Sequence, residues 1–332
     1  MRFLNSIHLL MENFKQTFKL LLYRLIMTVV FVALCSAFVL PELVEIAQNE
    51  SAQALLENVK NVFKAFVSPS LEEPSVYMEK IFGEGGSLQQ FIDFILSMKF
   101  ELILACIGCV VVYLLKRFLD TLVYFTFGAV LNDKMTTYTD TPFFTAFVAN
   151  LGKASAYAAV YVPTVFLFDV CTGALCFLLL RFLPLFAALF LCVTLIVAVQ
   201  SFKLTYTGRW MPAMTADGKR LGAAIRKSNH EKRQNAKTLC LYVVTVYTII
   251  ILNAIAAVFT FGSALLITIP TSYLLLICEN YVNYYTIMGE KYFINYDRIA
   301  TNPDHGDSEH FFEYIEEIEK KEETVVNGTE NE

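Results

Sequence analysis

Long apolar runs, separated by shorter polar segments, dominate the hydrophobic pattern of this chain. A membrane-spanning helix needs about 20 consecutive, mostly apolar residues, and six windows come close to that length or exceed it. The predicted transmembrane helices cover residues 20–40, 100–122, 154–180, 184–202, 239–261 and 264–285. The pattern therefore predicts an all-α fold, a polytopic helical membrane protein with six spanning helices.

Amphipathic patterns fill the segments around the first two spans. Residues 1–19 repeat apolar side chains at steps of three and four, which predicts an amphipathic helix at the membrane interface. Its predicted polar face holds Asn5, Glu12, Asn13, Lys15 and Gln16. Residues 41–99 are predicted to form a helical insertion outside the cytoplasm, because a helical apolar stripe is followed there by a break rich in Pro and Ser.

The segment 123–153 is predicted to lie in the cytoplasm or at the membrane interface. Residues 118–131 are too short and too polar to cross the membrane again. They either prolong the second helix or lie along the inner surface of the membrane.

Positive charge fixes the predicted orientation. Residues 203–238, predicted as a basic cytoplasmic loop, hold nine of the 26 Lys and Arg residues, whereas the tail 286–332 is mainly acidic. With both termini in the cytoplasm, 21 of the 26 fall inside and five outside. Lys and Arg favour the cytoplasmic side, so the expected topology is N-in and C-in.

The composition agrees with a membrane protein and argues against several kinds of site and partner. Of 332 residues, 56% are apolar and 17% charged, and the mean hydropathy is +0.52. All eight Cys lie in apolar runs, which favours packing over disulfides or metal binding, also for the pair Cys106 and Cys109. Orientation explains the basic segment, so no nucleic-acid partner is expected. The expected location is a cell membrane, that of a bacterium by preference.

Polar side chains inside the predicted spans are the candidates for chemistry, because they are costly there and usually pair or serve a function. These candidates are Asp169, Asn253, Glu279 and Asn280. Two interpretations remain open: a proton- or cation-coupled pathway through Asp169, Asn253 and Glu279, or hydrogen bonds that pack helices together. No Lys or Arg is expected deep enough in a span to neutralise Asp169.

A second group of candidates lies in the basic segment. Its members would face anionic lipid headgroups or the acidic tail, and docking of the tail is left open. They are Arg220, Arg226, Lys227, Lys232 and Arg233. No catalytic constellation accompanies them, because all four His lie outside the spans and no HExxH motif occurs. We therefore expect no enzyme, no cofactor and no metal site.

Two segments carry a resemblance in pattern to bacterial membrane families. They are the aromatic and basic lead NFKQTFKLLLYR and the returning segment GRWMPAMTADGKRLGAAIRKS, which accompany tight apolar hairpins. The pattern resembles YesL-type proteins, found beside carbohydrate-uptake systems, and the membrane domains attached to some glycerophosphodiester phosphodiesterases. The insertion 41–99 departs from it, so no site residues are carried over.

That resemblance implies an accessory or transport-linked membrane protein. The first functional hypothesis is an accessory or assembly subunit associated with transport, with the bilayer and either a membrane-protein partner or a second copy as its partners. The alternative is a small proton- or cation-coupled transporter that uses Asp169, Asn253 and Glu279. The substrate and the oligomeric state are left open.

Overall fold

A computed structural model describes residues 2–67, 74–83, 85–230, 232–302 and 307–310. Within these ranges, six helices are long and apolar enough to cross a membrane, which confirms the predicted polytopic, predominantly helical class. They are α2 (Lys15–Gln48), α6 (Lys99–Thr137), α7 (Phe143–Phe182), α8 (Leu185–Thr207), α11 (Lys232–Phe259) and α12 (Leu265–Met288).

The chain divides into two compact units. One comprises residues 25–116, and the other comprises residues 1–24 and 117–332. Helices α2 and α6 contribute to both. We call the first the insertion unit, because it contains the predicted insertion 41–99, and the second the bundle unit.

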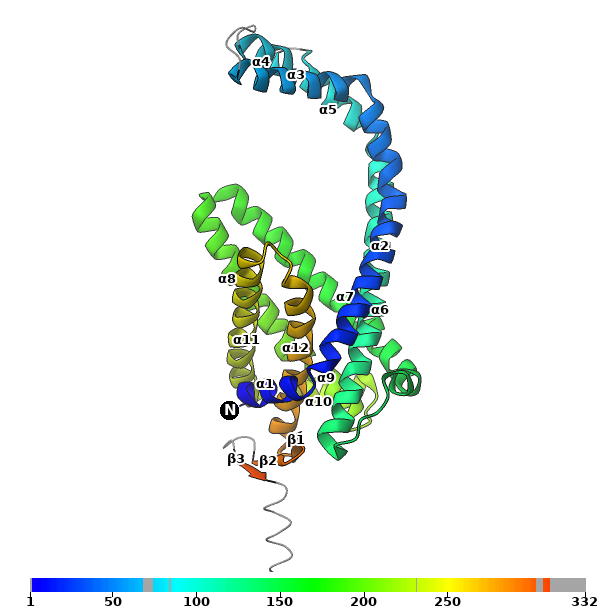
Figure 1. Ribbon diagram of the computed structural model, residues 1–332, viewed down its shortest axis with the longest axis vertical. Helices are drawn as coiled ribbons and strands as arrows, with labels where there is room; N and C mark the ends of the chain where they lie inside the picture. The colour runs from blue at the N-terminus through cyan, green and yellow to red at the C-terminus, as the bar shows by residue number, and fades with distance from the viewer. Residues whose placement is uncertain (1, 68–73, 84, 231, 303–306, 311–332) are drawn as a thin grey trace, which may run out of the picture. The chain divides into compact units, whose positions relative to one another are not determined.

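Short helices form the insertion unit beyond the ends of α2 and α6. They are α3 (Glu50–Val67), α4 (Pro74–Phe82) and α5 (Ser87–Ser97), and each packs on the other two (Figure 1). Ile81 and Met98 are buried among them, and the Asn58 side-chain amide donates to the Ser87 hydroxyl at 3.2 Å. Segment 41–99 is thus helical, as its apolar stripe predicted.

Four long helices of the bundle unit pack in chain order. Helix α7 packs on α8, α8 on α11, and α11 on α12 (Figure 1). The α7–α8 and α11–α12 connections are short, so each pair forms an antiparallel hairpin. Side chains near both hairpin tips are exposed, including Phe186 and Phe259, and a lipid environment would cover them.

The apolar core of the bundle unit surrounds the second half of α12. Residues Cys278–Thr286 of that helix are all buried, and α12 contacts α1 (Arg2–Glu12) and α9 (Trp210–Thr215). Helix α6 supplies the other side of this core. An added Cβ at Gly128 would lie 2.7 Å from the Met211 Sδ atom and 2.8 Å from the Tyr281 hydroxyl oxygen, so a larger residue there would require these side chains to shift.

The structure decides between the two alternatives for residues 118–131. Helix α6 continues without interruption to Thr137, so these residues prolong the second helix. Phe125 and Met135 are fully buried on this extension. The extension fills part of the core of the bundle unit.

The predicted basic loop 203–238 requires a correction, because most of it is helical. Helix α8 runs to Thr207, α9 follows, α10 covers Leu221–His230, and α11 begins at Lys232. Trp210, Met211 and Met214 are buried against the core. The charges of this segment predicted a polar loop, but its apolar side chains pack against the core as short helices.

The predicted polar face of residues 1–19 is also largely reversed. The helix ends at Glu12 and α2 begins at Lys15, and Asn5, Asn13 and Gln16 are buried instead of exposed. The Asn5 amide donates to the Tyr292 hydroxyl at 3.1 Å. Buried polar side chains are tolerated where they find such partners, so α1 turns this face toward the protein.

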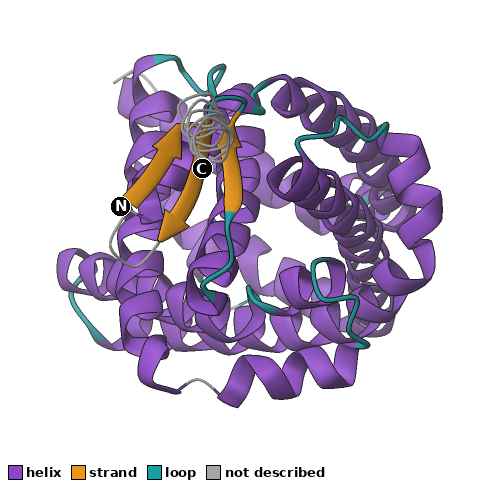
Figure 2. Cartoon of the chain, turned by 90° about the horizontal axis from the view of Figure 1, so that it is seen from below, coloured by secondary structure: helices purple, strands orange, loops and turns teal. Residues whose placement is uncertain are grey.

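A small sheet interrupts the predicted acidic tail 286–332. Strands β1 (Tyr292–Asn295), β2 (Arg298–Asn302) and β3 (Asp307–His310) form an antiparallel sheet in the order β1-β2-β3 (Figure 2). Tyr292, Ile294 and Ala300 are buried, and β1 packs on α1. The predicted docking of the tail on the basic segment falls on residues outside the described ranges.

Candidate functional site

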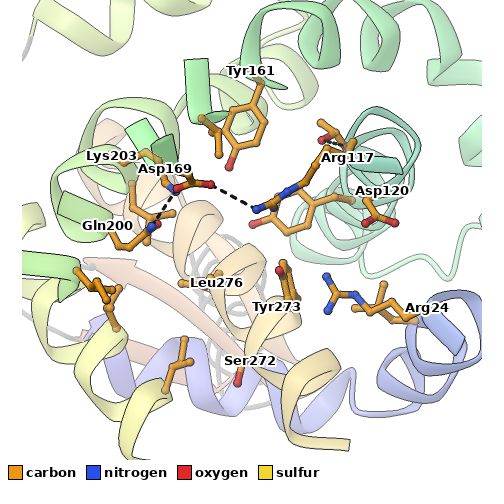
Figure 3. A pocket seen from close by; sticks show the side chains of 18 of the residues that line it. Arg24, Arg117, Asp120, Tyr161, Asp169, Gln200, Lys203, Ser272, Tyr273 and Leu276 are labelled. Atoms are coloured by element: carbon orange, nitrogen blue, oxygen red, sulfur yellow. Dashed lines mark hydrogen bonds and ion pairs between the residues drawn. The ribbon is translucent and has the colours of Figure 1, made fainter. Parts of the chain in front are cut away.

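A cavity of about 420 Å³ lies inside the bundle unit, and all six long helices contribute to its wall. Figure 3 shows its side chains converging from several helices. The polar lining residues are Tyr23, Arg24, Arg117, Asp120, Thr121, Tyr124, Tyr161, Asp169, Gln200, Lys203, Ser272 and Tyr273. Such a concentration of polar groups between spanning helices is unusual, because each is costly in an apolar environment.

Asp169 of α7 is held by donors from two other helices. Its Oδ1 atom accepts hydrogen bonds from Gln200 Nε2 and Lys203 Nζ, both on α8 and both at 3.1 Å. Its Oδ2 atom pairs with Arg117 Nη2 of α6 at 3.4 Å. The carboxylate thus lies between Arg117 on one side and the α8 donors on the other (Figure 3).

The expectation that no cation reaches Asp169 is therefore wrong. Arg117 had been placed at the inner end of the second span, but α6 extends to Thr137 and leaves Arg117 well inside the helix. Lys203 had been assigned to the basic loop, but it belongs to α8 and its side chain is only 8% exposed. Both misplacements follow from taking the end of an apolar run as the end of a helix.

Arg24 forms a second feature of the cavity. Its guanidinium carbon lies 3.5 Å from the ring centroid of Tyr273 on α12, a cation–π contact. Arg24 comes from α2, near the start of the first apolar run, where sequence reasoning had counted it only for topology. A cation stacked on an aromatic ring keeps its charge available to other partners.

The charges lining the cavity do not cancel. Three cations, Arg24, Arg117 and Lys203, face two carboxylates, Asp120 and Asp169, which leaves a formal excess of one positive charge. A net charge in a low-dielectric site favours a bound ion of opposite sign.

Apolar side chains complete the wall. Helix α11 contributes Val246, Ile249 and Ile250, and α12 adds Leu276. A wall that combines polar groups with an apolar part can hold both the polar and the apolar groups of a small organic molecule.

The structure does not gather the predicted intramembrane residues into one pathway. Asp169 lines the cavity, whereas Asn253 and Glu279 are not among its lining residues. Asn253 donates to Ser272, which does line it, at 3.2 Å. Asn280 accepts a hydrogen bond from the Tyr242 hydroxyl at 2.6 Å. These amides act in contacts between α11 and α12.

Glu279 is fully buried on α12, apart from the cavity. The Thr245 hydroxyl of α11 donates to its Oε1 atom at 2.6 Å. Its Oε2 atom has no hydrogen-bond partner among the described residues. The packing interpretation fits this contact between two helices.

The predicted basic candidates separate into three groups. Arg220 and Arg226 are exposed. Lys227 donates to Asp217 Oδ2 at 2.7 Å and to the Tyr284 hydroxyl at 3.2 Å. The side chains of Lys232 and Arg233 lie outside the described residues.

Asp217 gathers these donors into a compact ionic cluster. Lys227, Lys219 and Tyr284 contact its Oδ2 atom at 2.7, 2.9 and 2.7 Å. Partial burial alone would raise the pKa of the Asp217 carboxyl, but these hydrogen bonds outweigh it and lower the pKa to about 2. The cluster joins the turn after α9 to α10 and the end of α12.

Among the described residues, no group of three or more His, Cys, Asp or Glu side chains could hold a metal ion. No protein family, curated protein or solved structure was found to match this chain. The resemblance to YesL-type proteins and to phosphodiesterase membrane domains therefore stays a prediction.

Proposed function

We propose that this multi-pass membrane protein is a carrier for a small solute, which binds in the cavity of the bundle unit. One observation carries the proposal: a charged cavity whose wall is built from all six long helices. Its volume of about 420 Å³ lies in the range of roughly 300–1,000 Å³ that is typical of ligand pockets.

Two prolines beside the cavity would allow the helices that form its wall to bend. Pro163 lies inside α7 between the lining residues Tyr161 and Val165, and Pro270 lies inside α12 just before Ser272. A proline inside a helix removes one backbone hydrogen bond and weakens the helix locally. Bending at these points would change the access of the cavity to either side.

The plasma membrane of a bacterium, with both termini in the cytoplasm, is the proposed location. The distribution of Lys and Arg supports this orientation, because of the 23 that do not line the cavity 18 then lie on the cytoplasmic side.

Uptake by proteoliposomes tests the carrier function. We would reconstitute the full chain and measure the uptake of organic anions, cations and neutral sugars. We expect saturable uptake of one class and at least a tenfold loss in Arg117→Gln, since each hydrogen bond to a charged group contributes about 1.5–3 kcal/mol. Lys153→Gln, an exposed change on α7, should leave uptake unchanged. Folded protein without saturable uptake of any class would contradict the proposal.

A second candidate function, an accessory or assembly subunit, is favoured by the insertion unit. Leu56, Phe63, Phe82 and Leu96 are each more than half exposed on its short helices. Exposed apolar groups outside a spanning segment often mark interfaces. Affinity purification from native membranes should then yield a stable partner that is lost in Leu56→Ser with Phe63→Ser. Retention of the partner by this variant would count against the interface.

A further inference from the structure

The hydrogen bonds that hold the Asp169 carboxylate are longer than those that hold another carboxylate of the same chain, Asp217. Its three donors lie at 3.1, 3.1 and 3.4 Å. The donors of Asp217 lie at 2.7, 2.7 and 2.9 Å, within the range of about 2.7–2.9 Å expected for charge-assisted hydrogen bonds. The longest Asp169 contact, to Arg117, is the one that an incoming group could most easily replace.

Arg117 is also the accessible member of this network. Its side chain is 37% exposed, whereas that of Lys203 is 8% exposed. If Asp169 released Arg117, it would keep Lys203 and Gln200 on its other oxygen atom. The cavity would then have three cations for two carboxylates and one bound anion, so the formal charges would balance.

We propose that the ligand of this cavity is a small organic monoanion, whose carboxylate or phosphate diester group replaces Asp169 on Arg117. The inference rests on the proposed carrier function and names its class of substrate. Asp169 acts as an internal stand-in that neutralises Arg117 while the cavity is empty. The apolar groups of α11 and the ring of Tyr273 surround the organic part of the anion.

The replacement of Asp169 by a bound anion would link ligand binding to the contacts between helices. In the structure the Asp169–Arg117 pair joins α7 to α6. A bound anion ends this pair, and α7 then remains tied to α8 through Lys203. Ligand binding thus removes one contact between α7 and α6, while ring contacts such as Phe125–Tyr157 remain, and this loss gives the carrier a way to sense its substrate.

Three probes of one shape test the charge preference. Benzoate, benzamide and benzamidine differ mainly in charge, and their affinities for the full chain in phosphatidylcholine nanodiscs can be measured by calorimetry, with the monoanionic diester methyl phenyl phosphate as a second anion. We expect benzoate to bind at least about tenfold more tightly than either of the others, because a charge-assisted hydrogen bond is lost with them. Benzamidine binding as tightly as benzoate, or neither anion binding, would overturn the inference.

Variants test the replacement of Asp169. Asp169→Asn should raise the affinity for benzoate about fivefold or more, because the competing carboxylate is gone. Arg117→Gln should lower it about tenfold, and Lys153→Gln should leave it unchanged. A folded Asp169→Asn protein with unchanged or weaker benzoate binding would rule out the exchange. The probe series on the wild-type chain stands even if this variant does not fold.

The anionic group could belong to a solute or to a lipid headgroup. Adding phosphatidylglycerol to the nanodiscs separates these sources. If the site binds lipid headgroups, phosphatidylglycerol should displace benzoate. If the site binds solutes, benzoate should stay bound. Benzoate that binds but is not taken up by proteoliposomes would contradict the carrier function and leave the anion site intact. Uptake of cationic or neutral solutes alone would support a carrier and overturn the anion inference.

Discussion

Asp169 illustrates which properties of a single residue could be predicted from the sequence. Its placement inside a span was predictable, and so was its need for a partner. Its partners were not, because Arg117 and Lys203 lie at the ends of apolar runs but inside helices. Hydropathy locates the apolar run, whereas the helix ends where packing and hydrogen bonding cease.

Asn5 shows a related limit. Its position among polar residues predicted exposure, yet it is buried and bonded to Tyr292, which lies 287 positions away. Helical periodicity cannot reveal such a distant partner. The burial of a polar helix face therefore depends on partners that the local sequence does not show.

The Asp217 cluster yields a prediction for one carboxylate. Since its pKa is lowered from 3.8 to about 2, it stabilises the fold above about pH 4, and this stability is lost as pH falls toward 2. Asp217→Asn should lower the free energy of unfolding at pH 7 by about 1–2 kcal/mol, with allowance for solvent screening. Thermal unfolding monitored by the fluorescence of Trp210 would measure it.

The exposed Asp93 of α5 provides the control for that measurement. Asp93→Asn should unfold like the wild type at every pH. The deficit of Asp217→Asn should shrink as the pH is lowered below about 4, because the wild-type carboxyl then also loses its charge. Equal stability of Asp217→Asn and the wild type at pH 7 would show that the cluster contributes nothing.

At the scale of elements, six long helices were predictable because each carries an apolar run of the required length. Their true lengths were not: α6 has 39 residues and α7 has 40, far more than a span needs. The extra turns pack against protein instead of lipid. The small sheet was missed because the acidic composition of the tail outweighed the short apolar alternation around Tyr292 and Ile294.

Close packing of α8 on α11 and α12 leads to a second prediction. At Gly208 an added Cβ would lie 2.6 Å from Asn280 Oδ1 and 2.8 Å from the Tyr242 hydroxyl, two atoms that are hydrogen-bonded to each other. Gly208→Ala should therefore destabilise the protein by about 1–3 kcal/mol, the usual cost of overpacking. Thermal unfolding of the purified protein would measure the loss.

Gly152 of α7 is the matched control, because an added Cβ there meets no atom within 4 Å. Gly152→Ala should leave stability unchanged or raise it by up to about 1 kcal/mol, since alanine favours a helix over glycine. Similar effects of the two substitutions would mean that the approach at Gly208 is not tight.

At the scale of the whole molecule, the balance of Lys and Arg predicts the sides of the membrane. Cysteine introduced at Glu57, in the insertion unit, should react with a membrane-impermeant maleimide on intact cells. Cysteine at Arg226 should react only after permeabilisation. The wild-type chain is the control, because its eight cysteines lie in the long helices. Labelling of position 226 on intact cells would show that the true topology is the reverse of the predicted one.

The charged cavity also has a consequence for the order in which the protein is assembled in the membrane. Asp169 and Lys203 sit on consecutive helices, so their pair can form as soon as the α7–α8 hairpin is inserted. Arg24, on the first long helix, stacks on Tyr273 of the last one. Because a chain is inserted from its N-terminus, Arg24 must wait for the end of synthesis, and incomplete chains would carry this charge without its ring.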